Sequence, residues 1–160
     1  MMRLTLVLMT AFAMLATGCT KKGDSTGVLQ PILTAWQQGD QATAVQRFVE
    51  ADWTRRPLFA SDSPLNFTEK QFAALSPSEQ EVKAKQFMAR VPELRELGMA
   101  VLNAGNDAAE KKDMVKARTY IVAVQHYGEA LNHADHPAIV QLVGKALKKM
   151  SDTALGKLNP

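Results

Sequence analysis

Cysteine is almost absent from this chain of 160 residues, and the single one, Cys19, lies close to the amino terminus. One cysteine excludes an intrachain disulfide, so a folded body must be held together by an apolar core. Aromatic residues make up only 6% of the sequence. After residue 27 no segment is continuously apolar over the roughly 20 residues that a membrane-spanning helix needs.

The sequence also has little that points to catalysis or to nucleic acid. No glycine-rich phosphate-binding loop is present, and no spacing of carboxylates places two of them in one cleft for acid–base chemistry. The formal net charge is +3, and it falls to +2 without Arg3, which is too small to indicate nucleic-acid binding. We therefore expect a protein that is not an enzyme, needs no cofactor and binds no nucleic acid.

The most informative segment is the first one, whose order of charge, apolar run and small residues is typical of a secretory leader. Arg3 supplies the positive charge, and residues 4–15 are apolar except for Thr5 and Thr10. A helix of about 12 residues is roughly 18 Å long, well short of the ~30 Å hydrocarbon core of a bilayer. A cleaved signal peptide is therefore expected rather than a permanent span.

Residues 15–19 read Leu-Ala-Thr-Gly-Cys, which resembles the lipobox of bacterial lipoproteins, although Ala16 stands where that family usually has leucine. The resemblance implies cleavage between Gly18 and Cys19, a diacylglycerol on the Cys19 sulfur, and a fatty acyl group such as palmitate on the new amino terminus. Two or more acyl chains anchor a protein stably. The alternative is an ordinary signal peptide with an unmodified cysteine.

Thr20 after the cysteine resembles the sorting pattern of outer-membrane lipoproteins, so we expect attachment to the outer membrane, facing the periplasm. The organisation that follows is a signal peptide over 1–18, the lipidated cysteine and a polar tether over 19–27, and one domain over 28–160. The tether is rich in Gly, Ser, Thr and Lys, and has no large apolar residue. The domain is long enough to bury a core of its own.

The domain is predicted to be all-α, because helix-start signals and apolar spacings of three and four recur along it. Asp40 and Asp113 stand where N-caps are expected, and Thr68 and Ser76 open two capping boxes. Pro92 is expected to end one helix and begin another.

An apolar stripe is expected along one face of the last-but-one helix, from Met114 to Leu131, at spacings of three and four residues. Gly128 lies within that stripe, where glycine costs about 1 kcal/mol relative to alanine. We expect the compensation to be close approach of another helix.

Two segments 73 residues apart share one pattern, Gly39-Asp40-x₃-Ala44-x₃-Phe48 and Lys112-Asp113-x₃-Ala117-x₃-Ile121. The pattern resembles the second helix of a tetratricopeptide (TPR) unit, in which a small and a larger apolar residue pack between paired helices. Gly105 lies where that family has its first-helix glycine. The fold class is thus expected to be either TPR-like helical hairpins or an irregular helical bundle.

Two groups of side chains are candidate sites. The irregular stretch around residues 53–66 holds Trp53, Arg55, Arg56 and Phe59, which could meet an anionic or aromatic ligand or a partner, or could simply cover one end of the bundle.

The second group, His126, Glu129 and His133, lies on one helix face at spacings that suit Zn²⁺ or Cu²⁺. The same face points away from the apolar stripe, so an exposed polar surface explains it fully.

Two functions follow from these patterns. The first is a non-catalytic lipoprotein whose helical body binds a protein partner in the cell envelope through a groove between helices. The alternative is an envelope lipoprotein that binds a small ligand or a metal through one of the two candidate sites.

Overall fold

A computed structural model describes residues 26–158 of the protein. The described part is helical, and it contains a short 3₁₀ turn, η1 (Pro64–Asn66), and six α-helices. These are α1 (Gln30–Gln37), α2 (Gln41–Glu50), α3 (Glu69–Ala73), α4 (Pro77–Glu110), α5 (Met114–Leu131) and α6 (Ala138–Leu158). The all-α prediction is therefore confirmed.

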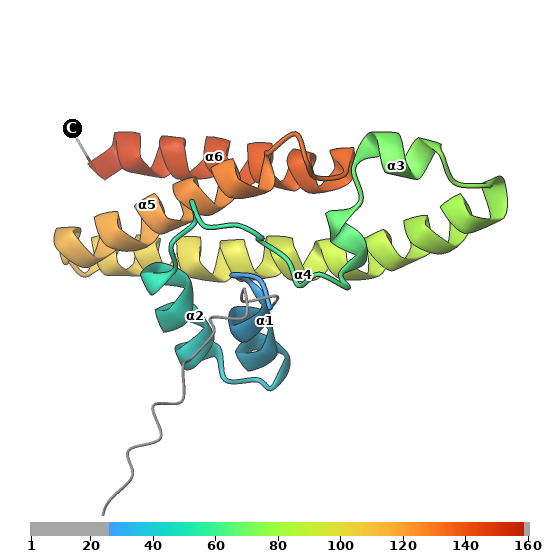
Figure 1. Ribbon diagram of the computed structural model, residues 1–160. Coiled ribbons are helices and arrows are strands. Elements are labelled where there is room, and N and C mark those ends of the chain that lie inside the picture. Colours follow the sequence, from blue (N-terminus) through green and yellow to red (C-terminus); the bar gives the residue numbers. More distant parts are fainter. Residues whose placement is uncertain (1–25, 159–160) are drawn as a thin grey trace, which may run out of the picture.

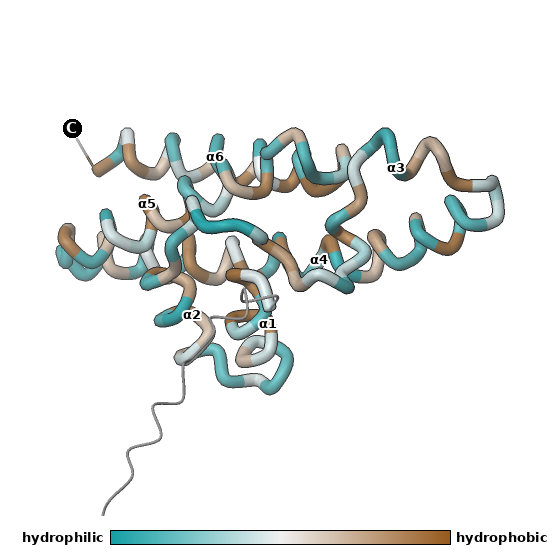
Figure 2. The backbone as a smooth tube through the Cα atoms, viewed as in Figure 1, coloured by the Kyte–Doolittle hydropathy of each residue, from teal (hydrophilic) through white to brown (hydrophobic). Residues whose placement is uncertain are grey.

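The bundle is built on α4, which has 34 residues and runs the length of the molecule (Figure 1). The helices α5 and α6 pack beside it, while the short α1–α2 hairpin crosses it on the other side. The long connection from α2 to α3 lies over the middle of the bundle. Apolar and polar stretches alternate along α4, α5 and α6, as expected for helices with one buried face (Figure 2).

Three aromatic side chains from different segments form the centre of the core. Phe48 of α2, Trp53 of the following loop and Tyr127 of α5 are all buried, and their ring centroids lie 4.7–4.9 Å apart. Tilted and edge-on contacts of this kind favour one fixed arrangement. The Tyr127 hydroxyl donates a hydrogen bond of 3.2 Å to the Leu94 carbonyl of α4, so the cluster joins α2, α4 and α5.

The helix starts are those that the sequence predicts. Asp40 and Asp113 accept hydrogen bonds of 3.1 Å from the backbone N–H groups of Thr43 and Lys116. Capping boxes form at Thr68 and Ser76 with both reciprocal bonds in place. Each cap satisfies backbone donors that a helix terminus leaves without a partner.

The prediction that Pro92 interrupts the chain is wrong, because α4 continues through it without a break. Proline removes one backbone donor and leaves the carbonyl four residues earlier, that of Met88, without its usual helical partner. Met88 is 62% exposed, so water can reach this part of the helix. The helix also gains from apolar packing of residues on both sides of the proline, Phe87 and Leu94, which are buried.

The predicted close approach at Gly128 is confirmed. A Cβ atom on Gly128 would lie 2.8 Å from the backbone oxygen of Gly144, and one on Gly144 would lie 2.5 Å from the oxygen of Gly128. The two glycines therefore face each other where α5 crosses α6. Backbone fills the space that side chains would need, so neither position tolerates a larger residue without a shift of one helix.

The two similar segments fold into the same helix–turn–helix corner. In the first, the N–H groups of Gly39 and Asp40 donate to the carbonyls of Trp36 and Ala35. In the second, Lys112 and Asp113 donate in the same way to Ala109 and Ala108. Both are Schellman motifs, in which the residue after the helix takes a left-handed conformation.

The left-handed residue differs between the corners, with φ of +79° at Gly39 and +62° at Lys112. A side chain at such a φ costs about 1 kcal/mol or more. We expect Lys112→Gly to raise the free energy of unfolding by about 0.5–1 kcal/mol, after the greater entropy of glycine in the unfolded chain is subtracted. Urea denaturation measures it, with Gly39→Lys as the reciprocal variant that should lose about 1 kcal/mol. A loss of stability in Lys112→Gly would contradict the inference that the left-handed conformation at Lys112 is strained.

Candidate functional site

A surface groove with a volume of about 960 Å³ lies between α2 on one side and α4 and α5 on the other. Half-buried apolar or small side chains line its inner part, namely Trp36, Val45, Val49, Ala100, Ala104 and Tyr120. Charged groups stand at its edge, namely Glu50, Asp107, Lys111, Asp113 and Lys116. We call this surface the α2–α5 groove. An apolar floor with a charged rim is the usual arrangement for binding one face of a helix.

Residues of both repeated corners line the α2–α5 groove. Each corner turns its helix pair so that a buried alanine, Ala44 or Ala117, packs inward near the start of the second helix. At the second corner a Cβ on Gly105 would lie 2.8 Å from Ile121, so α4 and α5 lie close together there. Both helix pairs, α1 with α2 and α4 with α5, contribute residues to the lining of the hollow.

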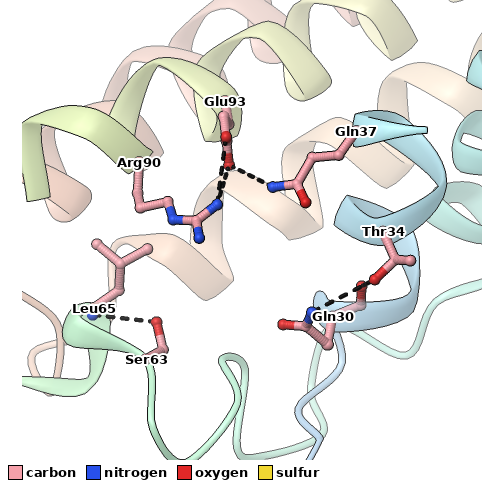
Figure 3. A network of polar contacts seen from close by, with 7 residues as sticks. All are labelled: Gln30, Thr34, Gln37, Ser63, Leu65, Arg90 and Glu93. Atoms are coloured by element: carbon pink, nitrogen blue, oxygen red, sulfur yellow. Dashed lines mark hydrogen bonds and ion pairs between the residues drawn. The ribbon is translucent and has the colours of Figure 1, made fainter. Parts of the chain in front are cut away.

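A second, smaller cavity of about 260 Å³ lies between α1, η1 and α4. The Arg90 guanidinium donates from Nη1 to both Glu93 carboxylate oxygens, at 3.4 and 3.2 Å. Glu93 also accepts a hydrogen bond of 3.1 Å from Gln37, which ties α1 to α4 (Figure 3). Gln30 and Asp62 also line this cavity. We call this cavity the Arg90 pocket.

The four predicted residues of the ligand loop differ in exposure. Trp53 and Phe59 are only 5% and 2% exposed, because both pack into the core. Arg56 is exposed, and its guanidinium donates to the carbonyls of Trp53 and Arg55, which holds the loop to itself. The burial of Trp53 and Phe59 agrees with a covering role for the loop, whereas Arg55 is exposed and lines a hollow beside α2. Phe59 does reach the Arg90 pocket, as part of its wall.

The predicted metal ligands are not gathered into a metal site. His126, Glu129 and His133 are all exposed on α5 or just beyond it. Glu129 faces Lys148 of α6 at 3.7 Å, and His133 contacts Asp135 at 3.1 Å. Within residues 26–158, no group of three or more His, Cys, Asp or Glu side chains is placed to hold a metal ion.

Sequence reasoning missed His136, which is only 5% exposed and stacks edge-on against Phe59 at 5.1 Å. Neither ring nitrogen has a hydrogen-bond partner among the described residues. Burial lowers the pKa of His136 to about 4, and the charges of Arg56 and His133 act in the same direction. Asp135 and the Leu65 carbonyl oppose the shift more weakly. The ring is therefore neutral at physiological pH.

This neutral ring makes stability depend on pH. Unfolding returns the pKa of His136 from about 4 to its usual value near 6.5, so the unfolded chain binds the proton first as the pH falls. The contribution of the neutral His136 ring to the free energy of unfolding is fully present above pH 6.5. We expect about 3 kcal/mol of it to be lost between pH 6.5 and pH 4. Urea denaturation along this range measures it. In His136→Leu the slope should largely vanish, whereas His126→Gln at an exposed position should keep it; an unchanged slope in His136→Leu would contradict this assignment.

Two features of the amino-terminal segment concern residues that the structure does not describe. The predicted cleavage and lipidation positions, Gly18 and Cys19, lie outside residues 26–158. Residues 23–27 also match Gly-x-Ser-x-Gly, which the sequence-based prediction of a non-enzyme overlooked. A nucleophile elbow needs a strand before its serine, and no strand occurs within the described residues. That match therefore gains no support from the fold.

None of the helices in residues 26–158 combines the length and the apolarity that a bilayer span requires. Comparison with known proteins adds no further constraint. No protein-family model matches the chain, and neither a curated protein nor a solved structure matches it significantly.

Proposed function

We propose that the protein is a lipid-anchored bacterial lipoprotein whose helical body binds a protein partner in the cell envelope without catalysing a reaction. The lipobox-like residues 15–19 support the anchor, and the expected attachment is to the outer membrane through Cys19. The observation that carries the binding role is the α2–α5 groove, with its apolar floor and charged rim.

The groove favours one kind of partner, an amphipathic helix. Its floor offers aromatic and aliphatic side chains such as Trp36, Val45 and Tyr120, which can receive apolar side chains spaced three and four apart. The rim carries both signs of charge, with Glu50 and Asp107 among the acids. A partner helix with a mixed-charge outer edge therefore matches it, since complementary rim charges set register more than affinity.

The test is site-specific photocrosslinking in living cells, using the full chain. A benzoylphenylalanine at Gln46, an exposed residue lining the groove, should give a discrete adduct, whereas one at Lys149, exposed on α6, should not. Ala104→Arg places a long cation on the groove floor and should remove the adduct, while Ala146→Arg at an exposed α6 position should keep it.

The control for folding is the helical circular dichroism of each variant. Gln41→Arg at the exposed edge of the groove is the milder substitute should Ala104→Arg unfold the protein. The same adducts from Gln46 and Lys149, or none from Gln46, would contradict a partner in the groove.

A second candidate function rests on the Arg90 pocket, which suits a small, uncharged, hydroxyl-bearing ligand. Glu93 already compensates the charge of Arg90, and Asp62 adds a further carboxylate, so an anionic ligand is disfavoured. Leu33 and Leu65 give the wall an apolar part. Thermal-shift screening with monosaccharides tests it, and Gln30→Ala should abolish any shift; no shift from any sugar would contradict this function.

A further inference from the structure

The two Schellman corners have the same backbone conformation but carry different side chains. The α1–α2 corner carries uncharged residues at positions where the α4–α5 corner, 73 residues later, carries cations and larger apolar groups. The matched positions are Gln38 and Lys111, Gly39 and Lys112, Gln41 and Met114, Ala42 and Val115, and Thr43 and Lys116. One corner is therefore a natural control for the other.

The apolar side chains of the α4–α5 corner point into solvent. Val115 is 81% exposed and Met114 is 50% exposed, although both begin the helix that supplies much of the core. The buried face of α5 starts only at Ala117. In Figure 2 hydrophilic and hydrophobic stretches adjoin at this turn. Two neighbouring exposed apolar groups at a helix tip have no role in the packing of the bundle.

Three exposed lysines, Lys111, Lys112 and Lys116, flank these two side chains in the sequence, and the exposed Glu110 precedes them. The one acid among residues 111–116, Asp113, accepts the Lys116 N–H as the helix cap, so its carboxylate is directed back to the backbone. That carboxylate offsets the partial positive charge of the α5 amino terminus, so the basic character of the corner rests on the three lysines.

The backbone adds an independent observation. Lys112 has a φ of +62°, a conformation that glycine adopts without strain and that Gly39 adopts at the matched position. A lysine thus stands where the backbone conformation favours glycine. Strain of this kind at an exposed position is a reason to look for function at that residue.

From these observations we propose that the α4–α5 corner is a membrane-contact surface, in which Met114 and Val115 enter the interface and the three lysines bind anionic phospholipid headgroups. Apolar side chains flanked by basic ones are the pattern of interfacial binding. The proposal does not depend on lipidation of Cys19.

The test uses the full chain with Cys19→Ser, so that a polarity-sensitive fluorophore reports from one engineered cysteine. With Val115→Cys labelled, vesicles of phosphatidylcholine containing about 30% phosphatidylglycerol should shift the emission to the blue, and vesicles of phosphatidylcholine alone should not. The shift should disappear at about 1 M salt, because the Debye length is then about 3 Å. Ala42→Cys, labelled at the matched position of the other corner, should show no shift with either vesicle.

A charge variant tests the lysines directly. Lys111→Gln combined with Lys116→Gln should weaken the response to anionic vesicles roughly 25-fold, since each lysine at a membrane surface contributes about fivefold. Equal shifts at Val115→Cys and Ala42→Cys, or no shift at either, would overturn the proposal. A shift with soluble polyglutamate and none with vesicles would also overturn it, and would assign the corner to an acidic protein.

Discussion

Gly144→Ala is expected to lower the free energy of unfolding by about 3 kcal/mol, the upper end of the usual cost of overpacking. The added methyl group would lie 2.5 Å from the Gly128 oxygen and 2.6 Å from the Asn132 nitrogen, both of which are backbone atoms. A flexible side chain could move aside, but these atoms can yield only if α5 and α6 separate. Urea denaturation followed by circular dichroism measures the loss.

The matched control lies on the same helix. A Cβ on Gly156 would meet nothing within 4 Å, so Gly156→Ala should gain up to about 1 kcal/mol from helix propensity alone. The opposite signs separate the contact between helices from any general effect of alanine in α6. A Gly144→Ala variant as stable as Gly156→Ala would contradict the close backbone contact between α5 and α6 at Gly144.

Cys19→Ala is expected to abolish lipid attachment completely, because the chain has no second cysteine to take its place. Cells fed an alkyne analogue of palmitate should label the wild-type protein and leave the variant unlabelled. The variant should also keep its leader and migrate as a larger chain, since a lipoprotein-specific peptidase acts after the cysteine is modified. Ser25→Ala, in the tether, is the control and should be labelled like the wild type; labelling of Cys19→Ala would contradict attachment at Cys19.

Local structure was predictable from the sequence where a few neighbouring residues decide it. The caps at Asp40 and Asp113 and the capping boxes at Thr68 and Ser76 need only residues within one turn of the helix start. Gly128 was predictable for a related reason, because a glycine within an apolar stripe has few explanations other than close helix packing.

Long-range packing was harder to predict. Pro92 reads as a break because proline disrupts isolated helices, yet the buried residues on either side of it keep α4 continuous. Trp53 and Phe59 lie in an irregular segment where no periodicity separates buried from exposed positions. Their place in the core depends on contacts with distant helices, as the stacking of Trp53 on Tyr127 illustrates.

The candidate site shows the same division. The α2–α5 groove combines residues from four helices, α1, α2, α4 and α5, so no local motif indicates it. The repeated Asp–Ala pattern at Asp40 and Asp113 did indicate paired helices. His136 was missed because it follows a helix in a polar stretch, and only the fold places it against Phe59.

The two proposed surfaces lie next to each other. Lys111 and Lys116 belong both to the α4–α5 corner and to the rim of the α2–α5 groove. A corner resting on a membrane would therefore hold one end of the groove close to the lipid. A helix bound in the groove would then lie close to the membrane surface. We therefore expect the partner helix to come from a protein that is itself at the membrane.

The most direct test of lipid anchoring is the intact mass of the mature protein purified from bacterial membranes. We predict a chain that begins at Cys19 and carries the added mass of a diacylglyceryl group and an amino-terminal acyl group. An unmodified chain, whether it retains residues 1–18 or is cut at another bond, would contradict the proposal that this helical body is held at the membrane through Cys19.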